Sequence, residues 1–290
     1  MLKRINWKAV FAVFAWSVSL SGLVLLMSFI EVEKSATVCK EVKIIIPGNK
    51  NFIERSEVDQ ILLESGGRLL GRELKNVNIQ DLESSLKANP FIRFAKVYAD
   101  MDGVINVHIS QREPILRIIN VANMDFYVDS EGLKMPISDN FTANVLIANG
   151  LIYEDYSGRV DTLNSRLAKD LFKTASFISQ DTLWNNQIEQ LYVNQKSEIE
   201  MVPRVGNQNI ILGNADSLKV KFSNLYMFYK KALPLVGWNT YKTINIKYIN
   251  QVIGIKNPDT LQTKPVNTVK SAVALAADSS ATTIQDTTKN

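Results

Sequence analysis

The segment IRFAKVYADMDGVINVHISQ, residues 92–111, carries the clearest strand pattern in the first half of the chain. It contains two runs rich in β-branched and aromatic residues, 92–100 and 104–111, separated by Met101-Asp102-Gly103. Such a short polar stretch ending in Gly is typical of a hairpin turn. Aliphatic residues alternate with polar ones in the second run, which indicates one buried and one exposed face. The segment therefore predicts a pair of antiparallel strands.

The sequence before this hairpin predicts one strand and two helices. EVKIII, residues 41–46, is a strand candidate that Pro47-Gly48 ends. Ser56 begins a capping-box-like pattern, and Gly66-Gly67 stops the helix that follows. Asn78 caps a second, shorter amphipathic helix. Residues 39–117 are therefore expected to form a β-α-α-β-β domain.

The second unit, residues 118–256, is expected to be a mostly antiparallel β domain with flanking helices, so the fold class is α+β. Aliphatic stripes over 164–179 and 217–233 predict two helices that pack on a sheet. Short β-rich runs predict seven strands, at 126–128, 145–147, 188–193, 198–202, 210–212, 243–248 and 251–255.

The amino-terminal region predicts a membrane anchor. Residues 1–8 form a short basic end, and Ala9 to Ile30 is a run of 22 residues without a charge. As a helix this run is about 33 Å long, which matches the hydrocarbon core of a bilayer. Bases before the run and acids after it place the amino end in the cytoplasm and export the rest. A cleaved signal peptide is the alternative, but its apolar core is usually shorter.

The remaining composition excludes several classes of site. The 33 Lys and Arg against 29 Asp and Glu give a net charge of +4, and the basic end accounts for most of it, which does not favour nucleic-acid binding. One Cys, the juxtamembrane Cys39, and one His exclude an intramolecular disulfide and a Cys/His zinc cage. Metal binding by carboxylates alone stays open. Residues 257–290 lack aromatic residues and are expected to be a disordered tail.

No constellation in the sequence favours catalysis. His108 lies in the polar register of its strand, and no G-x-S-x-G elbow accompanies it. Residues 84–87 match S-x-x-K and residues 138–140 read SDN, but K-T-G is missing and the two matches fall in separate units. GGRLLGRE, residues 66–73, lacks the Lys and hydroxyl of a phosphate-binding loop. We therefore expect neither an enzyme nor a cofactor.

An ordered series of motifs resembles the FtsQ/DivIB family of bacterial division proteins, whose exported part begins with a POTRA domain. The resemblance covers about residues 1–256. The motifs are VHISQREP at 107–114, FYVDSEGLKMP at 126–136, VLIANG at 145–150, NIILGNADSLKVKFSNL at 209–225 and INIKYINQVIGIK at 244–256. Two positions depart from the family pattern: Gln111 stands where Glu is common, and Asn214 stands where a basic residue is common.

The resemblance implies a non-enzymatic scaffold of the septal division complex in the cytoplasmic (inner) membrane, with most of the chain in the periplasm. The implied partners are coiled-coil membrane proteins of the FtsB/DivIC and FtsL types and, less directly, the septal peptidoglycan synthase. The closing strand, followed by the tail, could leave a sheet edge open to a partner strand. The candidate partner-binding residues are Lys247, Tyr248, Asn250, Gln251, Val252, Ile253 and Ile255.

Two other classes of protein share some of these features. POTRA modules also resemble the chaperone-like docks of outer-membrane insertion and secretion proteins, but there they precede a β-barrel. A membrane-anchored envelope hydrolase with a degenerate active site is the second alternative. Binding of a coiled-coil division partner, as opposed to turnover of cell-wall fragments, discriminates the scaffold from the hydrolase.

Overall fold

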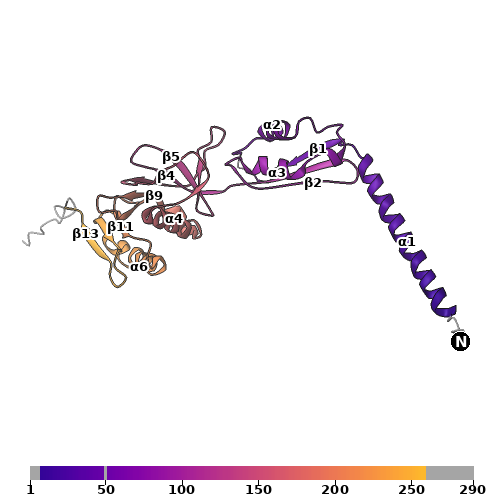
Figure 1. Cartoon of the computed structure of the whole chain (residues 1–290). Helices are drawn as coiled ribbons and strands as arrows, with labels where there is room; N and C mark the ends of the chain where they lie inside the picture. Colours follow the sequence, from indigo (N-terminus) through magenta and orange to yellow (C-terminus); the bar gives the residue numbers. More distant parts are fainter. Residues whose placement is uncertain (1–6, 49–50, 259–290) are drawn as a thin grey trace, which may run out of the picture.

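The chain forms an elongated molecule with a long helix at one end (Figure 1). The computed structural model describes residues 7–48 and 51–258, except the side chains of 7–10 and 28–36. The predicted basic end and tail therefore lie almost wholly outside the described residues. Helix α1, Trp7–Ala36, is continuous over 30 residues. Within the part of the chain described with side chains, no helix has both the length and the apolar character needed to cross a membrane.

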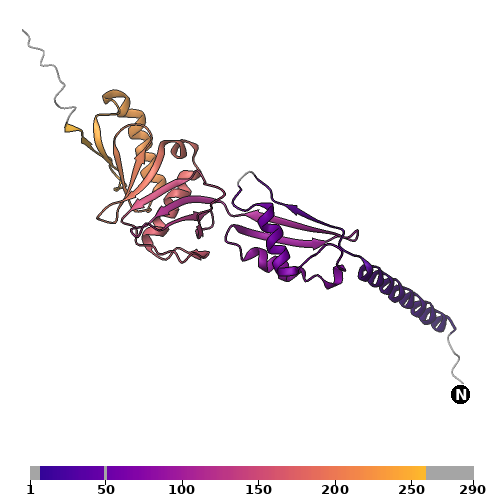
Figure 2. The same cartoon turned by 90° about the horizontal axis from the view of Figure 1, so that it is seen from above.

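The next unit has the predicted β-α-α-β-β order and a three-stranded sheet, which Figure 2 shows from above. Strand β3 lies in the middle, parallel to β1 and antiparallel to β2. The elements are β1 (Glu41–Ile45), α2 (Arg55–Gly66), the short 3-10 helix η1 (Leu74–Asn76), α3 (Ile79–Lys87), β2 (Ile92–Ala99) and β3 (Val104–Gln111).

The caps of the two helices differ in how well the sequence predicts them. Asn78 accepts a hydrogen bond from the amide of Asp81 and caps α3 as predicted. The prediction that Ser56 begins α2 is wrong, because Glu54 is the N-cap and shares a capping box with Glu57. The Glu54 side chain is long enough to accept a hydrogen bond from the backbone amide of the third helical residue, as a Ser N-cap usually does. The cap therefore lies two residues earlier than expected.

The helices α2 and α3 pack on one face of this small sheet. Their buried residues join those of the strands in one core: Cys39, Ile44, Ile53, Val58, Leu62, Leu69, Leu82, Leu86, Ile92, Ala95, Val97, Ile105, Val107 and Ile109. Burial raises the pKa of the Cys39 thiol, so this cysteine is a packed core residue and not a reactive thiol.

The second unit contains a mixed sheet of ten strands. Three pairings, β4–β7, β7–β9 and β11–β12, are parallel. The other six pairings of described strands are antiparallel, so the sheet is mostly antiparallel, as expected. The strand order is β13-β12-β11-β10-β9-β7-β4-β5-β6-β8. The strands are β4 (Pro114–Ile119), β5 (Asp125–Asp129), β6 (Leu133–Pro136), β7 (Leu146–Gly150), β8 (Asp161–Thr162), β9 (Ile188–Val193), β10 (Ile199–Pro203), β11 (Asn209–Gly213), β12 (Tyr241–Asn245) and β13 (Ile253–Lys256).

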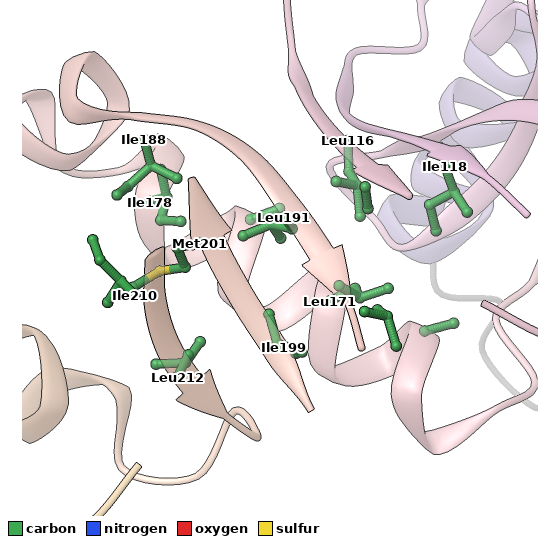
Figure 3. Packing of buried hydrophobic residues seen from close by; sticks show 14 of the residues in the cluster. Leu116, Ile118, Leu171, Ile178, Ile188, Leu191, Ile199, Met201, Ile210 and Leu212 are labelled. Atoms are coloured by element: carbon green, nitrogen blue, oxygen red, sulfur yellow. The ribbon is translucent and has the colours of Figure 1, made fainter. Parts of the chain in front are cut away.

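Helices cover one face of this sheet. Helices α4 (Arg166–Ser179) and α6 (Leu218–Lys231) carry the two predicted aliphatic stripes. Figure 1 shows them on the same side of the sheet. The short helices α5 (Thr182–Gln187) and α7 (Leu233–Val236) follow them. Figure 3 shows Leu171 and Ile178 of α4 among the buried strand residues. The opposite face of β9 to β13 carries both polar and apolar side chains, among them Glu200 and the exposed Tyr192 and Ile253.

Strand β3 leads into β4 through only two residues, Arg112 and Glu113. Strand β4 begins at Pro114 and belongs to the second sheet. The sheet changes here, a few residues before the expected boundary at residue 117.

Candidate partner-binding edge

Strand β13 is the last strand of the ten-stranded sheet, at the far end of the molecule from α1 (Figure 1). It pairs with β12 in antiparallel register, Ile253 with Asn245 and Ile255 with Thr243. No described strand lies on its other side. An edge of this kind presents backbone donors and acceptors to another chain.

The two faces of β13 have different surroundings. Ile253 is 40% exposed and Ile255 is 54% exposed, which is unusual for isoleucine. Gly254 lies between them, and the ring of Tyr241 rests on it. A Cβ at residue 254 would lie 2.5 Å from Cε1 of Tyr241. The glycine therefore lets β13 approach β12 closely, and its neighbours direct two aliphatic side chains to solvent.

A turn with an aromatic and a basic residue precedes β13. The Lys247 ammonium forms an ion pair with Glu198, Nζ to Oε1 at 2.5 Å, and lies 5.8 Å from the centroid of the Tyr248 ring. The hydrogen bond between these two side chains raises the pKa of Lys247 and lowers the pKa of Glu198. Lys247 is therefore held against Glu198, the residue before β10, and the exposed Tyr248 lies beside it.

The end of β11 contacts the aliphatic part of the Lys247 side chain. Gly213 has φ +82°, and a Cβ there would lie 2.8 Å from Cγ of Lys247. Beneath the turn after β11, Lys221 is 2% exposed, and its Nζ donates to the carbonyls of Leu212 and Asn214 at 3.1 and 2.9 Å. Burial lowers the pKa of Lys221. A buried lysine with carbonyl partners thus fixes the backbone on which Lys247 lies.

Two comparisons with family models bear on this arrangement. The FtsQ/DivIB, C-terminal related model matches residues 113–255, which run from the residue before β4 into the edge strand β13. The POTRA-like domain model matches residues 37–110, which is the β-α-α-β-β unit.

The chain belongs to the FtsQ/DivIB family.

A comparison with curated protein sequences finds no significant match. The resemblance seen in the sequence is thus confirmed at the level of the family, and both matched regions coincide with the two folded units of this FtsQ/DivIB protein.

The structure separates the predicted site residues into two groups. Ile253 and Ile255 lie in the edge strand, whereas Lys247, Tyr248, Asn250 and Gln251 lie in the turn before it. Val252 is partly buried and packs against the core of the β domain. The predicted strands 243–248 and 251–255 are shifted, because β12 already ends at Asn245 and β13 begins at Ile253.

Sequence reasoning missed several residues that build this site. Glu198 precedes β10, Gly213 ends β11 and Lys221 lies in α6. Nothing local in the sequence joins them to Lys247. Ile249 is 49% exposed, and its carbonyl accepts a hydrogen bond from Asn224 Nδ2 at 2.7 Å. The position of Ile249 directly after Tyr248 is the one sequence signal that could have indicated its role. The Asn214 side chain already makes a hydrogen bond within the domain, because its Oδ1 accepts from Lys221 Nζ.

The residues considered for catalysis do not form a site. His108 lies in β3, where its ring stacks on Tyr98 and its Nε2 is 3.3 Å from the Tyr98 hydroxyl. Ser84 and Lys87 lie in α3, whereas Ser138 lies in the β domain. Among the described residues, no group of three His, Cys, Asp or Glu side chains is placed to hold a metal ion.

Proposed function

We propose that this FtsQ/DivIB protein is a non-enzymatic scaffold of the bacterial division complex that binds an extended partner segment at β13. The observation that carries the proposal is the unpaired edge of β13, with its exposed Ile253 and Ile255 side chains. Main-chain hydrogen bonds to an added strand supply affinity, and the alternating side chains supply specificity. Tyr248 lies close to this edge in sequence and supplies an aromatic anchor.

The family supports partners of the FtsB/DivIC and FtsL types, which are coiled-coil membrane proteins, and through them the septal peptidoglycan synthase. We infer that such a partner binds through an extended segment outside its coiled coil, because an extended chain is what pairs with a sheet edge. The scaffold acts by holding these proteins together at the division septum, and no catalytic step is required of it.

We also propose that the chain is anchored in the inner membrane by residues 9–30, with the amino end in the cytoplasm. The uncharged run of 22 residues extends beyond the part of α1 whose side chains are described. The large apolar side chains described in α1, such as Phe14 and Leu26, are exposed. Lipid is the environment that would cover such a surface. Detection of a mature amino terminus between Ser28 and Cys39 would contradict the anchor.

Strand geometry indicates which amides of β13 face a partner. The amide of Asn257 donates to the carbonyl of Thr240, 2.8 Å away, so it points toward β12. Amides alternate in direction along a strand, and the bulge in this pair lies in β12. The amides of Gly254 and Lys256 therefore point away from β12, toward an added strand.

Replacing Lys256 by proline tests the proposed edge. Lys256→Pro removes an outward amide and leaves Ile253 and Ile255 in place. Lys256→Ala is the matched control, because it removes the same side chain but keeps the amide. We expect Lys256→Pro to weaken binding of a purified FtsB/DivIC-type ectodomain at least tenfold, as measured by calorimetry, and Lys256→Ala to bind nearly as well as the native chain. Circular dichroism of each variant shows that the domain is folded.

Equal affinity of folded Lys256→Pro and Lys256→Ala would refute the strand-addition site. Release of soluble fragments from purified peptidoglycan by the native chain would instead support the hydrolase alternative.

A further inference from the structure

Phe52 belongs to the POTRA-like unit but is buried mostly by the β domain. It precedes α2 and is completely buried. Its ring centroid lies 4.9 Å from that of Phe141 and 6.1 Å from that of Tyr127, both in the β domain. Phe91 of the POTRA-like unit stacks on it at 5.9 Å. We call this cluster the aromatic socket; its residues are Phe52, Phe91, Tyr127, Met135, Phe141, Ala143 and Val145.

The backbone of Phe52 is held as tightly as its ring. The Oε1 atom of Gln111 accepts hydrogen bonds from the amides of Phe52 and Ile53, at 2.9 and 3.2 Å. Gln111 is the last residue of β3 and is itself buried. From the β domain, the hydroxyl of Ser138 donates to the Phe52 carbonyl at 3.4 Å. One side chain next to the domain connection thus orients the residue that enters the socket.

Ion pairs join the two units beside the socket. Arg93 of β2 pairs with Glu131 at 2.9 Å, and Arg112 of the connection pairs with the buried Asp129 at 2.7 Å. The Arg112 amide also donates to the carbonyl of Phe91, and the Ser130 amide donates to the carbonyl of Glu113. The connection is therefore bonded to both units, and the socket adds a second attachment away from it.

We propose that the POTRA-like unit and the β domain move as one rigid body, locked by the insertion of Phe52 into the aromatic socket. A single two-residue connection would permit bending, but two separate attachments oppose it, because bending would withdraw a buried aromatic ring. Phe52 and Gln111 are then positioning residues, which fix the direction of β13 relative to the POTRA-like unit. This geometry belongs to the chain itself and holds whether or not β13 binds the proposed partners.

Distances between spin labels on the two units test the lock. Labels are placed on exposed residues by Ser84→Cys in α3 and Ser223→Cys in α6, with Cys39→Ala to remove the native thiol. The full chain, reconstituted in detergent micelles, is measured by pulsed electron paramagnetic resonance. We expect one narrow distance distribution. A broad or double distribution in this background, with both units folded by circular dichroism, would overturn the proposal.

Matched variants identify the residues that make the lock. Phe52→Ala empties the socket, and Phe94→Ala makes the same change at an exposed ring of β2. Gln111→Leu removes the acceptor for two amides, and Gln111→Glu keeps it. We expect Phe52→Ala and Gln111→Leu to at least double the width of the distribution, and both controls to leave it unchanged. A native width in folded Phe52→Ala would overturn the proposal, and should that variant not fold, a native width in Gln111→Leu would do so.

Discussion

At the residue scale, the buried pair of Lys134 and Glu154 shows how the β domain stabilises an internal charge. Their Nζ and Oε1 atoms are 2.9 Å apart, and both residues are almost completely buried. Burial opposes ionisation of Glu154, but hydrogen bonds from the amides of Asn164 and Ser165 and from Lys134 outweigh it and lower the pKa of Glu154 to about 2. Glu154 thereby fixes the start of α4 to β6.

Glu154→Gln should therefore destabilise the ectodomain, because it leaves a buried Lys134 without a counter-charge. We expect a loss of about 3 kcal/mol in the free energy of unfolding at pH 7. The pKa of a Glu in the unfolded chain is about 4.3. The native pair therefore contributes its full share of the free energy of unfolding above about pH 5 and loses it as the pH falls toward 2. Urea denaturation at pH 7 and pH 3 measures this. A difference between native and variant that is as large at pH 3 as at pH 7 would contradict the assignment.

At the scale of the element, the turn between β11 and α6 determines where Lys247 lies. Gly213→Ala places a Cβ on a backbone with positive φ and also displaces the Lys247 side chain. Gly158→Ala causes the same kind of backbone strain, at φ +79°, but its new Cβ lies in open space. We expect each to cost about 1 kcal/mol of stability, as thermal denaturation reports. Only Gly213→Ala should weaken partner binding, by severalfold, because the ion pair with Glu198 is disturbed. Equal binding by both variants would show that Lys247 does not position the edge.

At the scale of the whole molecule, the folded part of the chain should be independent of its tail. The cores of the two described units are complete without residues 259–290, and that segment contains no aromatic residue to bury. We expect truncation after Pro258 to change the Tm of the ectodomain by less than about 2 °C. Truncation after Ile249, which also removes β13, should lower the Tm and abolish binding of the FtsB/DivIC-type partner. A protease-sensitive ectodomain after the first truncation would show that the tail takes part in the fold.

Features that depend on near neighbours in the chain could be predicted from the sequence. The hairpin of β2 and β3, the Asn78 cap and the two long amphipathic helices of the β domain follow from alternation, capping and periodicity within a few residues. The family also follows from the order of short motifs along the chain. These patterns are local, and a residue's neighbours in sequence are sufficient to specify them.

How distant residues combine became evident only in the folded chain. The short strand β8 carries no periodic signal, and β13 became an edge because of the order of ten strands. In the sequence, Lys221 looks like an ordinary surface lysine of a helix. In the folded chain its Nζ is buried and donates to the Leu212 carbonyl at the end of β11. The Gln111 side chain accepts a hydrogen bond from the amide of Phe52, 59 positions away, and no sequence pattern predicts this partner. Such contacts depend on packing between segments far apart in the chain, and local periodicity contains no information about which segments meet.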